Sequence, residues 1–410
     1  MTDFDDSQGV NLLTLVRSGF TSRRQSLGLM LLKYESLIAA RRAVPPYSDV
    51  VSAAQFLEAL GVVHFGRWVM IKRLPFIRGT GQPRESGKWS YLLFMSNFNA
   101  GWRGYVDMFS ESLGDGLRYL WGKTPGWIGP EDENGGTEVF LDFVNDHVIE
   151  HQHYYAAYPY VSTADVKAAL HVDREVRSFA ATPRDGDLDQ WFAAYRVLLR
   201  RVQHSLGDIE GMPATAVTAA ESVPASAPTG LTVLCPFPGK DAGEPGSKHG
   251  CLKAIATGRL SPFADVPGTH FARLAVIDSV HLEGGNRLRL ESSYLLFAAD
   301  VDGPAEDYLT RMYDEMGATT INAIWEDCYG FDPAAGSEGF VAYLQRCSFA
   351  ATLPFADYPH VSAWDVVRAL ETHTWFTRLV FSTVSANPVD VRDLFEAGTG
   401  GAMSTTEMGS

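Results

Sequence analysis

The stretch "DYPHVSAWDVVRAL", residues 357–370, repeats a stretch found two hundred positions earlier, "AYPYVSTADVKAAL" at 157–170. Eight of these fourteen positions carry the same residue. The echo continues upstream, where "HFGRWVMI" at 64–71 matches "HFARLAVI" at 270–277. Because a period near 200 residues is far longer than a solenoid repeat, the chain is predicted to contain two homologous, domain-sized units.

The same order of elements is expected in both units. Short runs rich in β-branched and aromatic residues predict two strands, which are residues 64–71 and 91–98 in the first unit. An apolar stripe that begins at Tyr308 predicts an amphipathic helix after the corresponding strands of the second unit. A β-like segment is expected next, around Trp121 and Trp325, followed by a second helix and a last strand.

The serine and the aspartate of the repeated motif form a helix-start signal. Ser162 lies three residues before Asp165, and Ser362 lies three residues before Asp365. A serine at the N-cap accepts a hydrogen bond from an early helix amide, while the carboxylate three residues later reaches back to the serine amide. The repeated motif therefore predicts capped helices rather than a catalytic pair.

Shifts in composition divide the chain into five segments. A stretch rich in proline, alanine and serine predicts a flexible linker between the two units. The segments are an N-terminal helical extension (1–60), a first α+β repeat plus a long amphipathic helix (61–210), the linker (211–232), a second α+β repeat (233–396) and a flexible tail (397–410).

Charge and hydrophobicity exclude some classes of partner. The net charge of −15 would repel a phosphate backbone, so nucleic acid is not an expected partner. No stretch reaches the roughly 18 to 20 apolar residues that span a bilayer. The first residues are acidic rather than signal-like, and the four cysteines form no CxxC pair. These features predict a cytoplasmic protein with reduced thiols and no membrane span.

Two tandem units that mix short strands with two helices resemble the duplicated ferredoxin-like proteins of the dimeric α+β-barrel superfamily. That superfamily includes chlorite dismutases and dye-decolourising peroxidases, both of which bind haem. The string nearest to the GxxDG motif of those peroxidases is "ADVDG" at 299–303, with Ala299 at the first glycine position. The resemblance implies an α+β fold of two tandem ferredoxin-like repeats with added helices. It also implies a protein that binds haem or another small molecule and acts as a peroxidase-like oxidoreductase.

The haem interpretation assigns roles to six residues. Imidazole nitrogens ligate haem iron, and arginines bind carboxylates such as the haem propionates. The cofactor-binding candidates are His360, His153, His151 and Arg67, and the catalytic candidates are Asp302, as the acid–base group, and Arg273. Two alternatives stay open. Asp302 precedes a predicted helix and could cap it, and the histidine-bearing strand face could simply contact water.

The string "HVIEH", from His147 to His151, offers a different chemistry. The pattern H-x-x-E-H on a helix places two histidines on one face, where they can hold zinc while the glutamate activates water. The metal-site residues would be His147, His151 and Glu150. The competing interpretation is the end of an amphipathic helix, because Phe140, Val144 and His147 continue one apolar stripe.

A third interpretation requires no chemistry. A duplicated scaffold can form a stable pseudo-dimer, and the amphipathic helix at 188–206 can dock a protein partner or a second copy of the chain. The sequence thus leaves three functions open: a small-molecule- or haem-binding protein, a non-catalytic assembly protein and, more remotely, a zinc hydrolase.

Overall fold

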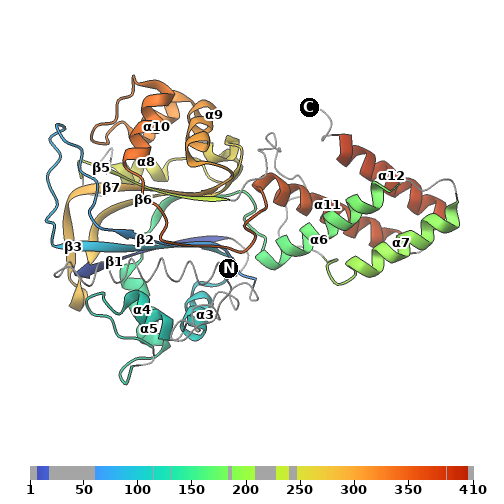
Figure 1. Cartoon of the computed structure of the whole chain (residues 1–410), viewed down its shortest axis with the longest axis horizontal. Helices are drawn as coiled ribbons and strands as arrows, with labels where there is room; N and C mark the ends of the chain where they lie inside the picture. The colour runs from blue at the N-terminus through green and yellow to red at the C-terminus, as the bar shows by residue number, and fades with distance from the viewer. Residues whose placement is uncertain are drawn as a thin grey trace.

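The computed structural model describes residues 7–17, 61–113, 115–130, 132–182, 187–207, 228–239, 247–384 and 386–404. Within these ranges the protein is a mixed α+β structure with two four-stranded antiparallel sheets. The sheets pack face to face, helices cover their outer faces, and a helical bundle projects from one end (Figure 1).

Each sheet combines three strands of one half with a fourth strand from the other half. The first sheet has the order β1 (Gln8–Arg17), β3 (Trp89–Phe98), β2 (Val63–Ile71) and β8 (Leu353–Ala356). The second sheet has the order β4 (His151–Ala156), β6 (Thr269–His281), β7 (Arg287–Val301) and β5 (Thr229–Phe237). Since β8 pairs with β2 and β4 pairs with β6, the two halves exchange their last strands.

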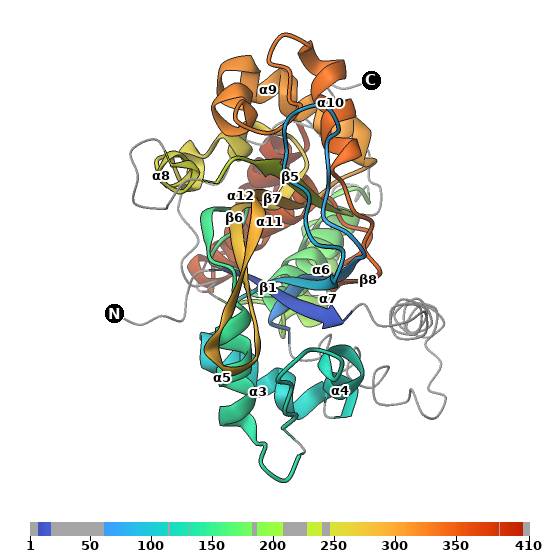
Figure 2. The same cartoon turned by 90° about the vertical axis from the view of Figure 1, so that its left-hand side faces the viewer.

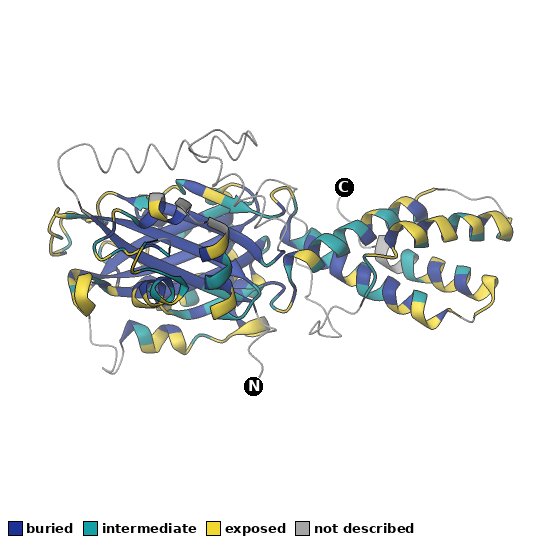
Figure 3. Cartoon of the chain, turned by 90° about the horizontal axis from the view of Figure 1, so that it is seen from below, coloured by how far each residue is buried: buried dark blue, intermediate teal, exposed yellow. Residues whose placement is uncertain are grey.

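The central strands are apolar on both faces because both faces are covered. β2 and β3 are buried along almost their whole length. Leu13, Val69 and Leu93 of the first sheet share one apolar cluster with Leu234 and Leu296 of the second. Figure 3 shows the sheets as the buried centre of the molecule. This two-sided burial explains why the sequence has continuous apolar runs here instead of alternation.

Helices form the two outer layers (Figure 1). The first sheet is covered by α3 (Trp102–Leu113), α4 (Asp115–Trp121) and α5 (Thr137–His147). The second is covered by α8 (Lys248–Lys253), α9 (Ala305–Trp325) and α10 (Gly336–Arg346). The β-like segment predicted around Trp121 and Trp325 is wrong, because both residues end helices and are buried in the adjacent cores. Tertiary packing here outweighs the strand propensity of an aromatic residue.

The strand connections cross from one half to the other. The β2–β3 connection, residues 72–88, reaches the second half, where the Glu85 carboxylate accepts hydrogen bonds from two amides of β7 and from the Tyr294 hydroxyl. The β6–β7 hairpin extends the opposite way to α5, where His281 Nε2 lies 3.6 Å from an Asp146 carboxylate oxygen. Figure 2 shows both crossings. Each half therefore extends one strand connection onto the other half.

The projecting bundle consists of α6 (Thr163–Ala180), α7 (Leu188–Val202), α11 (Ala363–Ser382) and α12 (Pro388–Ser404). Its aromatic core includes Trp191. The capping box predicted from the repeated motif is confirmed at the start of α6. The Ser162 hydroxyl accepts from the Asp165 amide, and the Asp165 carboxylate accepts from the Ser162 amide. Ser362 likewise accepts from the Asp365 amide at the start of α11.

Some segment boundaries differ from the expectation. Residues 8–17 form the strand β1 inside the expected helical extension, and the helix predicted over 22–60 lies outside the described residues. β5 begins at Thr229, inside the expected linker, of which residues 211–227 also lie outside them. α12 continues to Ser404, although a flexible tail was expected from residue 397. No helix in the described ranges is long and apolar enough to cross a bilayer.

Candidate functional site

Two arginines lie between the sheets at the centre of the molecule. Arg67 of β2 and Arg273 of β6 occupy matching positions in the two halves and are 3% and 1% exposed. Burying a guanidinium costs several kcal/mol unless its donors are bonded and its charge is compensated. Their partners therefore decide whether either arginine is available to a ligand.

Arg67 is bonded through every nitrogen to the second sheet. One terminal nitrogen donates to Asp300 Oδ1 at 2.5 Å, and Nε donates to Thr232 Oγ1 at 3.1 Å. The other terminal nitrogen donates to the carbonyls of Leu231 and Ala299, at 2.5 and 3.3 Å. Arg67 therefore fastens the first sheet to the second.

Arg273 makes the reciprocal attachment to the first sheet. It donates to the Val10 carbonyl at 2.8 Å, to Asn11 Oδ1 at 3.2 Å and to Asn97 Oδ1. Asn97 stands where the other half has Asp300, and its amide nitrogen donates to Asp300 Oδ2 at 2.6 Å. The two arginines thus share one carboxylate through a continuous hydrogen-bonded network.

A second buried network joins the tyrosines of the repeated motif. The hydroxyls of Tyr158 and Tyr358 lie 2.9 Å apart. Tyr358 contacts His64 Nδ1 at 2.6 Å, and Tyr158 contacts His270 Nδ1 at 2.7 Å. Burial raises the pKa of both tyrosines well above their ordinary value, so the hydroxyls stay protonated. The motif "YPxVS" is thus repeated partly because its tyrosines meet at the junction of the two halves.

The two ends of this chain of contacts differ in charge. His64 Nε2 lies 2.5 Å from Asn99 Oδ1, whereas His270 Nε2 lies 2.9 Å from Asp302 Oδ1. Burial lowers the pKa of His64 to about 4, so this ring is neutral near pH 7. The two halves therefore differ here, since an amide oxygen lies against His64 and a carboxylate oxygen lies against His270.

Asp302 is committed to the fold as well. Its Oδ2 accepts from the amide of Ala363, the first residue of α11, at 2.9 Å. The side-chain capping expected at the helix that follows it is wrong, because α9 begins after Pro304 without a side-chain cap. Asp302 instead caps a helix that is distant in sequence, and it has no exposed surface.

His151 and His153 lie on opposite sides of their sheet. Alternation along a regular strand would place both on one face, but this prediction is wrong because the β4–β6 pairing contains a bulge between them. The His151 ring lies 5.2 Å from the Tyr154 ring, on the side of Arg273. His153 points the other way, and its Nε2 lies 2.9 Å from Ser261 Oγ. Burial lowers the pKa of each histidine to about 4.

The "HVIEH" residues are not arranged on one helix. α5 ends at His147 and β4 begins at His151, so the helical spacing of the zinc motif is absent. His147 Nδ1 lies 2.7 Å from the carbonyl oxygen of Phe143, and Glu150 is exposed. In the described part of the chain, no group of three or more His, Cys, Asp or Glu side chains is placed to hold a metal ion.

The residues proposed to bind haem do not fit that cofactor. His360 is exposed just before α11, whereas His153 is buried behind the second sheet and Arg67 is buried between the sheets. The Arg67 nitrogens are already bonded to protein, so none is free for a propionate. The four candidates, His360, His153, His151 and Arg67, therefore do not surround one space.

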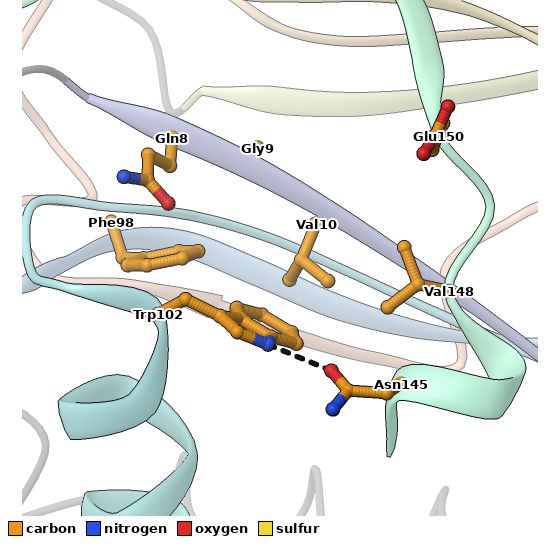
Figure 4. Close-up of a pocket in the computed structure, with 8 residues that line it drawn as sticks. All are labelled: Gln8, Gly9, Val10, Phe98, Trp102, Asn145, Val148 and Glu150. Atoms are coloured by element: carbon orange, nitrogen blue, oxygen red, sulfur yellow. Dashed lines mark hydrogen bonds between the residues drawn. The ribbon is translucent and has the colours of Figure 1, made fainter. Parts of the chain in front are cut away.

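A cavity of about 330 Å³ opens beside β1 (Figure 4). Phe98 and Trp102 form its apolar wall, and the Trp102 indole donates to Asn145 Oδ1 at 2.9 Å. Gln8 and Glu150 add an amide and one carboxylate. These residues include no nucleophile with a neighbouring base, so the cavity offers contacts but no catalytic pair.

A larger cavity, about 390 Å³, is formed by the β2–β3 connection. Its lining combines three arginines, Arg73, Arg78 and Arg84, with the aromatic rings of Phe76 and Trp89. All three arginines are exposed, and none forms an ion pair with an acidic residue in the ranges given above. The Arg84 guanidinium lies 4.7 Å from the centre of the Phe76 ring. Cationic groups on an aromatic wall favour an anionic ligand.

Sequence reasoning misses Gly9 and Gly230, which let the central arginines approach the opposite sheet. A Cβ added at Gly230 would lie 3.0 Å from Arg67 Cδ, and one added at Gly9 would lie 3.1 Å from Arg273 Cζ. The sequence signal that could have revealed these glycines is another short repeat, since "GVNLL" begins at Gly9 and the similar "GLTVL" begins at Gly230.

Replacing Gly230 with alanine is expected to lower the free energy of unfolding by about 1 to 3 kcal/mol, because the added methyl overpacks the buried Arg67 side chain. Urea denaturation at neutral pH measures the loss. Gly104→Ala is the matched control, since no atom lies within 4 Å of that added Cβ. A loss at Gly230 no larger than in the control would contradict the close contact.

No family model matches the chain, and no curated protein shows significant similarity to it. Function is therefore argued from the geometry of the sites, since one fold can serve many functions.

Proposed function

We propose that this protein binds a small anionic molecule, with an aromatic or other flat apolar portion, in the cavity of the β2–β3 connection. The observation that carries the proposal is a cavity of about 390 Å³ lined by three exposed arginines, none of which has a carboxylate partner among the residues that the structure describes. Guanidinium groups bind carboxylate and phosphate oxygens through paired, charge-assisted hydrogen bonds.

The local charge contrasts with that of the whole chain. Residues 72–88 contain five lysines and arginines and one acidic residue, in a chain whose net charge is −15. That acidic residue, Glu85, is engaged by β7: it accepts from the Ser292 amide at 3.0 Å and from the Tyr294 hydroxyl at 3.1 Å. These contacts both hold the connection in place and direct the only negative charge of this segment toward the protein.

The lining also accounts for the apolar part of the proposed ligand. Trp89 is half-buried and Tyr91 is buried, so the floor of the cavity is aromatic while its rim is cationic. Pockets of this size commonly combine an apolar lining with a few polar groups that fix the orientation of the ligand. A flat ring carrying a phosphate or carboxylate matches both features.

We infer that the scaffold carrying this cavity is a duplicated ferredoxin-like unit with exchanged last strands. The order of elements supports this, since β2, β3, a group of helices and β4 follow one another in the first half as β6, β7, a group of helices and β8 do in the second. α8 also lies between β5 and β6, where a ferredoxin-like unit has its first helix. In this arrangement the two repeated units form the scaffold, and the proposed binding site lies in the β2–β3 connection of one unit.

Calorimetric titration with phenyl phosphate, inorganic phosphate and phenol tests the proposal. We expect phenyl phosphate to bind more tightly than inorganic phosphate, with no binding of phenol. The triple substitution R73Q/R78Q/R84Q should weaken phenyl phosphate at least tenfold, since each lost charge-assisted hydrogen bond is worth about 1.5 to 3 kcal/mol. Raising the salt concentration should also weaken binding, because the cavity is open to solvent.

The matched control is R196Q/R200Q/K253Q, which removes the same charge from exposed positions outside the cavity. The control should bind phenyl phosphate as the unmodified protein does. Equal affinity in both triple variants, or no saturable binding of either phosphate, would exclude an anion site in this connection.

A further inference from the structure

The cavity beside β1 is separate from the cavity of the β2–β3 connection, and the two have no lining residue in common. Among the residues that line it, Glu150 is the only one that carries a charge, and Glu150 is exposed. Gln8 and Asn145 contribute neutral amides, and the rest of the lining is apolar. Figure 4 shows Phe98 and Trp102 on one side of the cavity and Glu150 on the other. This cavity therefore combines one negative charge with an aromatic wall.

The aromatic wall is held in place by neighbouring side chains. Phe98 stacks on Tyr105 with ring centres 3.7 Å apart, and Trp102 stacks on the same tyrosine with ring centres 6.0 Å apart. The Trp102 indole also donates to Asn145 Oδ1, which joins α3 to α5. Trp102 is half-buried, so part of its ring is open to a ligand. Because these contacts already fix the ring, a ligand that stacks on it costs little conformational entropy.

The polar side chains of the lining are available to a ligand. In the part of the chain that the structure describes, neither the Gln8 amide nor the Glu150 carboxylate forms a hydrogen bond or ion pair. The hydrogen bond between Gln152 and Glu150 uses the backbone carbonyl of Glu150 and leaves its carboxylate unbound. A carboxylate at the rim of an apolar cavity attracts a positively charged group.

The charges around the cavity also favour a cation. Residues 137–150 contain four acidic residues and no lysine or arginine. The guanidinium of Arg103, next to the cavity wall, is paired with the Glu138 carboxylate. Arg273 lies on the opposite side of β1, because a Cβ added at Gly9 would point at its guanidinium, whereas the next side chain along the strand packs beneath the helices. The local field is therefore negative and attracts cations.

We propose that this cavity is a second binding site, which takes a small organic cation carrying a quaternary, methylated ammonium group. Cations bind to the faces of aromatic rings, and the indole of a residue such as Trp102 attracts them most strongly. A quaternary ammonium group has apolar methyl groups and no N–H donor, so Val10 and Val148 can contact it without leaving a polar group unpaired. Glu150 compensates its charge, and the Gln8 amide bonds a hydroxyl at the other end of the ligand.

Calorimetric titration of the full chain with choline tests the proposal, with the neutral alcohol in which carbon replaces the choline nitrogen as the comparison. The two molecules have the same shape, so their difference in affinity reports the charge. We expect choline to bind about tenfold more tightly than the alcohol, and Trp102→Leu and Glu150→Gln each to weaken choline about fivefold or more. Salt should weaken choline less in Glu150→Gln than in the unmodified protein. Glu315→Gln, at an exposed position of α9 outside the cavity, is the matched control and should bind choline normally.

Three outcomes would overturn the proposal. Choline shows no saturable binding, the neutral alcohol binds as tightly as choline, or Glu150→Gln and Glu315→Gln bind choline equally well. Trp102 is the first residue of α3, so circular dichroism on Trp102→Leu separates lost binding from a lost helix. Glu150→Gln changes one exposed side chain and keeps the test decisive if Trp102→Leu does not fold.

Discussion

Asp300→Ala should lower the free energy of unfolding by about 3 to 5 kcal/mol, the cost of leaving a buried charge without its partner. Asp300 gives Arg67 a contact at 2.5 Å and accepts from Asn97 at 2.6 Å, and it is 4% exposed. Without it the Arg67 guanidinium would keep only neutral oxygen partners inside the sandwich. Guanidinium denaturation at pH 7 measures the loss.

Two further variants show whether charge or space is responsible. Asp314→Ala, at an exposed position of α9, should change stability by less than about 0.5 kcal/mol. Arg67→Met combined with Asp300→Leu removes both charges and should cost less than Asp300→Ala alone, because an apolar pair of similar volume leaves no unpaired ion. A double variant less stable than the single one would show that the hydrogen bonds, rather than the charge balance, hold the sheets together.

Acidification should destabilise the protein between about pH 6.5 and pH 4. Burial lowers the pKa of His64, His147 and His153 to about 4, from an ordinary value of 6.5. Above pH 6.5 both the folded and the unfolded chain hold these rings neutral, so their full contribution to stability is present. As the pH falls, the unfolded chain binds protons that the folded chain excludes. Each histidine then removes about 1.4 kcal/mol per pH unit, or about 3 kcal/mol by pH 4.

Urea denaturation at pH 7, 6 and 5 tests this, with His153→Gln as the diagnostic variant. The Nδ1 atom of His153 has no partner in the described structure, so glutamine keeps the polar contact to Ser261 and removes the titrating ring. The decrease in the free energy of unfolding per pH unit should become smaller by about the contribution of one histidine. His360→Gln removes an exposed imidazole and serves as the control. An unchanged slope in His153→Gln would show that this ring is protonated within the fold.

The fold is predicted from sequence wherever a pattern is local. The strand at 64–71 and the helix starting after Ser162 depend on apolar runs and a capping box, and both are confirmed. The strand β1 is missed because its sequence similarity to β5 covers only a few residues. In addition, the spacing between these two stretches differs from the spacing between the other repeated stretches. Nothing local encodes the exchange of β4 and β8, since pairing partners are chosen by the assembled core.

The candidate sites are less predictable because their meaning depends on partners distant in sequence. Arg67, Arg273 and Asp302 are recognisable as unusual, but only the structure shows that their own protein satisfies them. His151 and His153 are separated by a bulge that strand alternation does not reveal. The arginines of the β2–β3 connection line one cavity, in a segment that Glu85 attaches to the second half.

The exchange of strands also determines when each strand can find its partner during synthesis. β2 ends at residue 71, and its partner β8 begins at residue 353, which is 282 residues later. At roughly 5 to 20 residues per second, β2 would wait about 15 to 60 seconds for that partner. Throughout this time its outer edge is unpaired, and unpaired edges are sites of aggregation. A nascent chain of this protein should therefore depend on chaperones until its last strand is made.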